Sequence, residues 1–317
     1  KVYYNNIYHE MDDTQRENVF MHMDMPGWSQ TAGLSFDAFD WKVGQHTISV
    51  SSEYYTNYRR AEMTMFPNDE SQPPMFMLTW PDSRVHGLAA GITDNWHFGK
   101  NHLNTTFRLD YETSKVLDEF GQLQWEGMGY DMNDQRQFLL PQLKVSLSHH
   151  LSNTNSISVA TGYGQRAPTT SELYGFYLFN AHDGFDYLGN PNLKTEKLLS
   201  AEIGYTHSNE KWSFSSTLFL QQYFDYIFGL NTPYSAMTYG ANGVREYENI
   251  SEATFWGVEL EGLYNFSKTL SLQGKLDYLR GFRKKEDLPL IPPLQGTIGG
   301  SYTLHKFSFL TQSRMAA

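Results

Sequence analysis

The chain has 317 residues, no cysteine, a formal net charge of −11 and 15% aromatic residues. Without cysteine it has no disulfide framework and no thiolate nucleophile or metal site, and its acidic balance argues against nucleic acid as a partner. No run of 18 or more apolar residues offers a transmembrane helix, and we expect no signal peptide because Lys1 opens directly in strand-like sequence. The mean hydropathy is −0.52, but the chain is too rich in aromatic residues to be disordered.

Alternation of apolar and polar residues with a period of two runs through the whole chain, whereas helical patterning is almost missing. In residues 103–111, Phe107 lies on an apolar strand face and Arg108 on a polar one. The segments 257–266 and 270–278 divide in the same way. About thirteen segments fit this strand template. The sequence therefore predicts an all-β protein whose strands have one apolar and one charged face.

Connections between the predicted strands alternate between short and long. Short ones fall near 40–45, 99–101, 150–155, 208–211, 267–269 and 305, and long ones near 12–28, 59–82, 116–136, 166–196, 231–244 and 283–291. An antiparallel up-and-down meander with tight turns at one end and long loops at the other is typical of transmembrane β-barrels of outer membranes. Their strands of about ten residues are apolar outside and polar inside.

Aromatic residues lie near both ends of the predicted strands. Trp96 and Trp212 are near short connections, and Tyr111 and Tyr278 lie towards long ones, as expected of two interfacial girdles. A soluble β-sandwich or propeller, acting as a binding module or glycan-active enzyme, is the alternative of another class, because its strands would alternate in the same way.

A series of motifs begins in the stretch from Tyr163 to Gly204. The motifs are Arg166-x-Pro168, Glu172-Leu173-Tyr174, Gly189-Asn190-Pro191-x-Leu193-x-x-Glu196, Glu202-x-Gly204, Asn249 ahead of Gly257-Val258-Glu259, and Leu288-Pro289-x-Ile291-Pro292-Pro293. In this order they resemble the barrel of TonB-dependent outer-membrane receptors. The resemblance implies a barrel of about 22 strands around an N-terminal plug, in the outer membrane of a Gram-negative bacterium. It also implies uptake of a ligand with energy passed from the inner membrane through TonB.

The predicted strands are too few to close such a barrel. We therefore expect residues 1–317 to be its central to C-terminal part, without the plug, the TonB box and the first strands, and without the usual last strand that ends on an aromatic residue. Strands at the two edges would be left unpaired. Arg166 and Glu172 belong to motifs shared by receptors for unrelated ligands, so we assign them to barrel and loop architecture.

Methionine is distributed unevenly and lies close to histidine near the N-terminus. His9-Glu10-Met11 ends the first predicted strand, Met21-His22-Met23-Asp24-Met25 follows in the loop after it, and Met63-x-Met65 and Met75-x-Met77 occupy the next long loop. Thioethers are soft ligands that select Cu(I), and imidazole suits copper in either oxidation state. Positions i and i+2 of a strand share a face, so His9 and Met11 can converge on one ion from inside the barrel.

The segment IYHEMDD around this pair is similar to the corresponding segment of the TonB-dependent copper receptors. In those receptors a His-x-Met pair of the barrel meets a Cys and a Met of the plug, which implies that His9 and Met11 bind copper as the transported ligand. We expect a second or capture site at Met21, His22, Met23 and Met25. Methionine that packs without metal is the alternative, and it weighs most for Met63, Met65, Met75 and Met77.

Enzyme signatures do not accompany these patterns. The sequence has no GxSxG elbow, HExxH or P-loop, and Gly162-x-Gly164-x-x-Ala167 imitates a dinucleotide fingerprint within a predicted strand that no helix follows. We therefore predict a transporter without a catalytic cofactor, which interacts with the TonB system, outer-membrane lipid and a metal or metal chelate. An iron siderophore, haem or cobalamin is the alternative ligand for the same fold.

Overall fold

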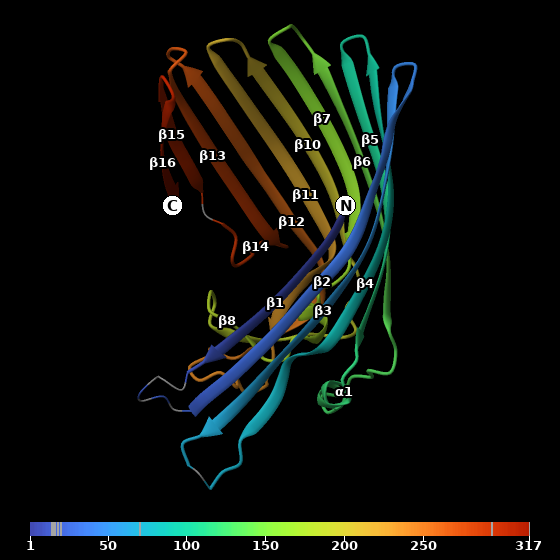
Figure 1. Cartoon of the computed structure of the whole chain (residues 1–317), viewed down its shortest axis with the longest axis vertical. Coiled ribbons are helices and arrows are strands. Elements are labelled where there is room, and N and C mark those ends of the chain that lie inside the picture. The colour runs from blue at the N-terminus through green and yellow to red at the C-terminus, as the bar shows by residue number, and fades with distance from the viewer. Residues whose placement is uncertain (14–16, 18, 20, 70, 293, 317) are drawn as a thin grey trace.

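The computed structural model describes residues 1–13, 17, 19, 21–69, 71–292 and 294–316 (Figure 1). Its strands are β1 (Val2–Asp12), β2 (Met21–Val43), β3 (His46–Pro67), β4 (Met75–Phe98), β5 (Asn101–Val116), β6 (Arg136–His150), β7 (Asn155–Arg166), β8 (Leu178–Asn180), β9 (Phe185–Leu188), β10 (Glu196–Ser208), β11 (Trp212–Asn231), β12 (Val244–Asn265), β13 (Leu270–Arg283), β14 (Glu286–Asp287), β15 (Gln295–Leu304) and β16 (Phe307–Ala316). Its helices are α1 (Glu119–Glu126) and α2 (Thr170–Tyr174). Among the described residues, no helix has the length and apolar character needed to cross a membrane.

Thirteen of the described strands form one curved antiparallel meander, in the order β1-β2-β3-β4-β5-β6-β7-β10-β11-β12-β13-β15-β16 (Figure 1). Within the described residues β1 and β16 are the two edges of this sheet, so the sheet is open. The predicted incomplete barrel of about thirteen strands is thereby confirmed.

Apolar side chains on the outer face of the sheet are exposed. The exposed fraction is 58% for Leu88, 59% for Leu139 and 55% for Ile203. A soluble sandwich would bury this face against a second sheet, so the alternative of a soluble sandwich is wrong. The exposed face is the one that a transmembrane barrel presents to lipid.

Short and long connections alternate along the meander as the sequence predicts. The β2–β3 and β4–β5 hairpins turn at Gly44 and Gly99, whose φ angles of +64° and +58° are in the left-handed region that glycine adopts without strain. The long connections gather at the opposite rim (Figure 1). In the described part of the chain, the short hairpins therefore lie at one end of the barrel and the long connections at the other.

Strands β2, β3 and β4 are much longer than the sequence analysis predicted. They contain 23, 22 and 24 residues, whereas about ten suffice to span a membrane. The predicted loops at 12–28 and 59–82 are wrong for residues 21–28, 59–67 and 75–82, which continue the strands, whereas residues 14–16, 18, 20 and 70 lie outside the described part of the chain. The Met-x-Met alternation is itself a strand pattern, and it pairs across all three strands.

Two helices in the long connections were not predicted. In α1 the Asp118 side chain accepts the Gly121 N–H at 3.0 Å, which caps the N-terminus. The Gln124 side-chain amide bonds to both the N–H and the carbonyl of Leu78, at 3.1 and 3.0 Å. Helix α1 therefore covers the edge of β4 beyond Val116, where β5 has ended. Helix α2 begins with a capping box of Thr169 and Glu172.

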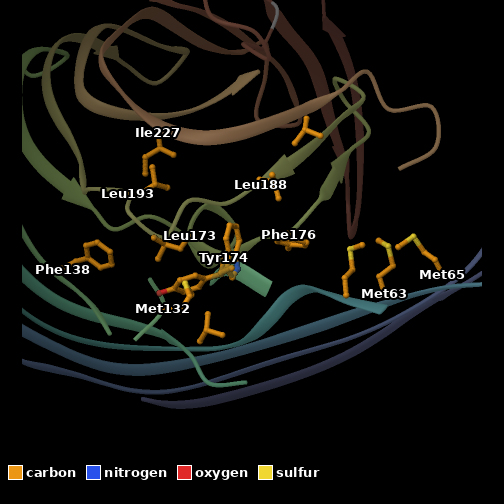
Figure 2. Packing of buried hydrophobic residues seen from close by; sticks show 14 of the residues in the cluster. Met63, Met65, Met132, Phe138, Leu173, Tyr174, Phe176, Leu188, Leu193 and Ile227 are labelled. Carbon is orange, nitrogen blue, oxygen red and sulfur yellow. The ribbon is translucent and has the colours of Figure 1, made fainter. Parts of the chain in front are cut away.

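The main hydrophobic core lies at the long-loop rim, where the 167–195 connection folds back over the inner wall (Figure 2). Leu173, Tyr174 and Phe176 of this connection are buried, and Phe176 meets the ring of Trp125 edge-on at 5.4 Å between centroids. Strand β9 pairs in parallel with the start of β12, which fixes the connection to the wall. The loops thus pack into the mouth of the barrel.

Arg166 fixes both ends of the same connection. Its guanidinium donates to Glu172 at 2.8 and 3.0 Å and to Glu196 at 3.0 and 3.2 Å. Glu196 also accepts the N–H of Ile227 at 2.9 Å. This network confirms the architectural role predicted for Arg166 and Glu172.

Candidate functional site

His9 and Met11 lie on the inner face of β1, near the long-loop rim. Tyr3 has the same strand parity, and its hydroxyl bonds to Glu53 on the lumen side at 3.1 Å. In the register with β2, His9 lies opposite Gly27 and Met11 lies opposite Met25. The small Gly27 leaves room beside the His9 imidazole, and Met11 has another methionine as its cross-strand neighbour.

Methionine side chains form two neighbouring rows across strands β1 to β4. The register of β2 and β3 on either side of Met25 places it opposite Met63, and Met63 pairs with Met77. These residues and Met11 make the first row. The second row consists of Met23, Met65 and Met75. Because positions i and i+2 share a face, both rows lie on the inner wall.

Burial divides these methionines into two groups. Met63, Met65 and Met77 are 7%, 3% and 4% exposed and belong to the hydrophobic core of the mouth (Figure 2). Met11 is 50% exposed and Met75 is 42% exposed. Half-buried Met21, Met23 and Met25 pack against the edge of the core. Buried thioethers thus serve packing, whereas the thioethers at the β1 end are open to the lumen.

A cavity of about 790 Å³ lies beside the methionines of β1 and the start of β2. Its lining includes His9, Met11, Met23, Met25 and Met63. The structure therefore brings the predicted pair together with three methionines of β2 and β3. The cavity is also lined by Trp28, Arg59, Trp80, Tyr177 and Phe179, which the sequence analysis missed because only the fold brings β2, β3, β4 and the 167–195 connection together.

The structure separates His22 from the methionines beside it in sequence. It has the opposite strand parity to Met21 and Met23 and lies opposite Phe66 in the register. Its Nδ1 lies 3.3 Å from Asp13 Oδ1, and the same oxygen accepts the Met23 N–H at 2.8 Å. Asp13 thus orders this end of β2 from the outer side, and His22 does not face the cavity.

Other polar contacts hold the loops that surround the cavity. The Tyr130 hydroxyl donates to Glu246, and burial together with this hydrogen bond raises the pKa of Tyr130. The carboxylate of Asp186 is fully buried and accepts the N–H groups of Met237 and Thr238 at 2.8 and 2.9 Å. Neither contact joins residues close in sequence, so no local motif could have revealed them.

Soft donors dominate the chemistry of this site. In the part of the chain that the structure describes, no group of three or more His, Cys, Asp or Glu side chains could hold a metal ion. One imidazole and a set of thioethers at the cavity instead suit a soft ion such as Cu(I) and disfavour hard ions that need carboxylates.

The meander is open and antiparallel, its outer face is apolar and exposed, and long loops fold into its mouth. This is the architecture of outer-membrane β-barrels. Residues 2–315 match the family model described as "TonB dependent receptor-like, beta-barrel". The chain therefore belongs to the TonB-dependent receptor family.

Solved structures with the same fold include receptors for different ligands. The copper transporter OprC is 20% identical with a TM-score of 0.75, over 100% of this chain and 48% of that chain. The ferric citrate transporter FecA in its unliganded form is 14% identical with a TM-score of 0.65, over 98% and 44% of the two chains. The ferric yersiniabactin uptake receptor FyuA from Yersinia pestis is 12% identical with a TM-score of 0.65, over 98% and 45%.

These similarities establish the fold alone. The chain spans about half the length of each of these receptors. No curated protein matches its sequence.

Proposed function

We propose that residues 1–317 are the central to C-terminal part of the barrel of a larger TonB-dependent receptor, in the outer membrane of a Gram-negative bacterium, and that this receptor imports copper. The observation that carries the proposal is the position of His9 and Met11, side by side on the lumen wall at a cavity that Met23, Met25 and Met63 also line. The fold similarity to the copper transporter OprC supports the same ligand.

Copper is the cargo in this proposal, and its binding requires no covalent chemistry. His9 offers an imidazole nitrogen, and Met11 and Met25, opposite each other in the register, offer thioethers at neighbouring positions. The half-buried Met23 is a further thioether in the lining of the cavity. Met65 and Met77 are packed in the core beside these ligands, and Met63 belongs both to the core and to the cavity lining.

Transport follows from the architecture of the family. Copper binds from the outside, in the mouth, and passes through the lumen when the plug, which we place outside residues 1–317, is displaced by TonB. The exposed Leu88, Leu139 and Ile203 face outer-membrane lipid. The partners are therefore TonB acting through the plug, the lipid around the barrel, and the copper ion.

Titration of the intact receptor with Cu(I) tests the proposal. Loss of even an outer-shell partner weakens metal binding about 10- to 100-fold. We therefore expect a His9→Ala/Met11→Ala variant to bind Cu(I) at least about tenfold more weakly. His22→Ala is the matched control, because His22 lies on the opposite face and should leave the affinity unchanged. An unchanged affinity in the double variant would refute the copper assignment.

A ferric siderophore is the second candidate ligand. It is favoured by the size of the cavity, about 790 Å³, and by Arg59 in its lining, because an organic chelate needs both space and a cation for its anionic groups. Haem and cobalamin fit the same argument of size. If the double variant leaves Cu(I) affinity unchanged while Arg59→Ala weakens binding of ferric citrate, the chelate is the ligand.

A further inference from the structure

Histidine is concentrated at the short-turn rim of the barrel, far from the methionine rows. Seven of the eleven histidines lie in or within two residues of a short hairpin turn, all of them in the described part of the chain. They are His46, His97, His102, His149, His150, His207 and His305. In outer-membrane barrels the short turns face the periplasm.

Three of these histidines have outward strand parity and fixed partners. His46 stacks on Trp96 with 5.1 Å between ring centroids and bonds to Asp94 at 2.8 Å. His207 stacks on Trp212 at 4.0 Å, and His149 bonds to Asn101 at 2.8 Å. Rings stacked on tryptophan near the short turns belong to the interfacial girdle of the barrel. The contacts of these three histidines therefore explain their positions without a ligand.

His97 and His102 instead face the lumen. They lie opposite each other on β4 and β5, and their rings are stacked with 4.2 Å between centroids and 14° between planes. The same face carries the polar pair Asn95 and Asn104, hydrogen-bonded at 2.9 Å. The apolar lipid face lies on the alternate residues, such as Trp96 opposite Leu103.

The nitrogens of this pair are largely unused by the protein. His102 Nε2 lies 3.3 Å from Asn95 Oδ1, and an Nε2–H donated there leaves Nδ1 with its lone pair. The described residues give the nitrogens of His97 no hydrogen-bond partner, and its side chain is exposed. Because the two ring planes are nearly parallel, one ring must turn before both lone pairs can meet at one point, and the exposed His97 is free to do so.

We propose that His97 and His102 form a second metal site at the periplasmic end of the lumen, which takes a borderline divalent ion such as Cu²⁺ through two imidazoles with water in the other positions. Imidazole suits copper, and Cu²⁺ binds nitrogen sites most tightly among the first-row divalent ions. The site depends on its own geometry and not on the ligand of the mouth, although copper imported through the mouth would pass it on leaving.

Cu²⁺ binding to the intact receptor tests this site, measured by titration and by the nitrogen hyperfine couplings in the electron paramagnetic resonance spectrum. The background is His9→Ala/Met11→Ala, which removes the mouth site and separates the two proposals. In this background we expect coupling to two nitrogens. In His97→Ala/His102→Ala the couplings should disappear and the affinity should fall at least about tenfold.

Two further variants keep the result decisive. His97→Ala alone leaves the hydrogen bond between His102 and Asn95 in place, so it should fold normally and lose one nitrogen coupling. His46→Ala/His207→Ala removes the same number of imidazoles from the girdle and should change neither coupling nor affinity. Unchanged couplings in His97→Ala/His102→Ala, or an equal loss in the girdle variant, would overturn the proposal.

Discussion

Replacing Arg166 by alanine tests whether one guanidinium holds the long 167–195 connection in the mouth. The guanidinium makes four hydrogen bonds to Glu172 and Glu196, and the side chains of these glutamates are 14% and 6% exposed. Removal of one partner of a buried ion pair costs about 3–5 kcal/mol, because a charge is left buried and unpaired. Arg166 itself is 42% exposed, so water can reach the vacated space and we expect the low end, about 3 kcal/mol.

Hydrogen exchange of the intact receptor measures this cost where it acts. We expect faster exchange in residues 167–195 and at the Ile227 amide, which donates to Glu196 at 2.9 Å. Arg280→Ala is the matched control, since Arg280 and Asp287 form a similar pair at 2.9 Å with side chains 53% and 65% exposed. An exposed pair contributes about 0–1 kcal/mol. If Arg166→Ala opens the connection no more readily than Arg280→Ala opens its own hairpin, the network does not hold the loop.

Two further predictions concern packing on the inner wall, and both are checked by denaturant unfolding of the intact receptor in detergent. Met65→Ala should destabilise the receptor by about 2–5 kcal/mol, because Met65 is 3% exposed. Met75→Ala, at a site that is 42% exposed, should change the free energy of unfolding by less than about 0.5 kcal/mol. Equal effects of the two substitutions would contradict the division into packed and open thioethers. Gly87→Ala should cost about 1–3 kcal/mol, because its Cβ would clash with the Tyr55 ring. Gly164→Ala should be neutral, because beyond its chain neighbours the nearest atom to its Cβ would be a side-chain carbon of Gln142 at 3.9 Å. A neutral Gly87→Ala would show that the ring moves freely.

Much of the fold could be predicted because its signals are local. Alternation with a period of two marks each strand, so the thirteen strands of the meander and the alternating connections agree with the structure. The capping box of α2 was also present in the sequence as Thr169-x-x-Glu172. Helix α1 has an N-cap aspartate, Asp118, but no capping box, and its place is set by the free edge of β4 beside Leu78.

The candidate site could be predicted only in part. The spacing of His9 and Met11 fixes their common face on any strand. That Met25 lies opposite Met11, and Met63 opposite Met25, follows from strand register, and register depends on pairing between residues far apart in the chain. The expectation that residues 21–25 form a loop also hid the alternation that turns His22 away from the cavity.

The sequence by itself determined which residues form strands, which face of each strand is apolar and which residues can act as soft ligands, because these properties depend on near neighbours in the chain. Only the tertiary structure decided which methionines are packed in the core, and that His97 and His102 meet. Burial of Met65 and the stacking of His97 on His102 both result from strand pairing and from loops that return to the mouth, and no local pattern encodes them.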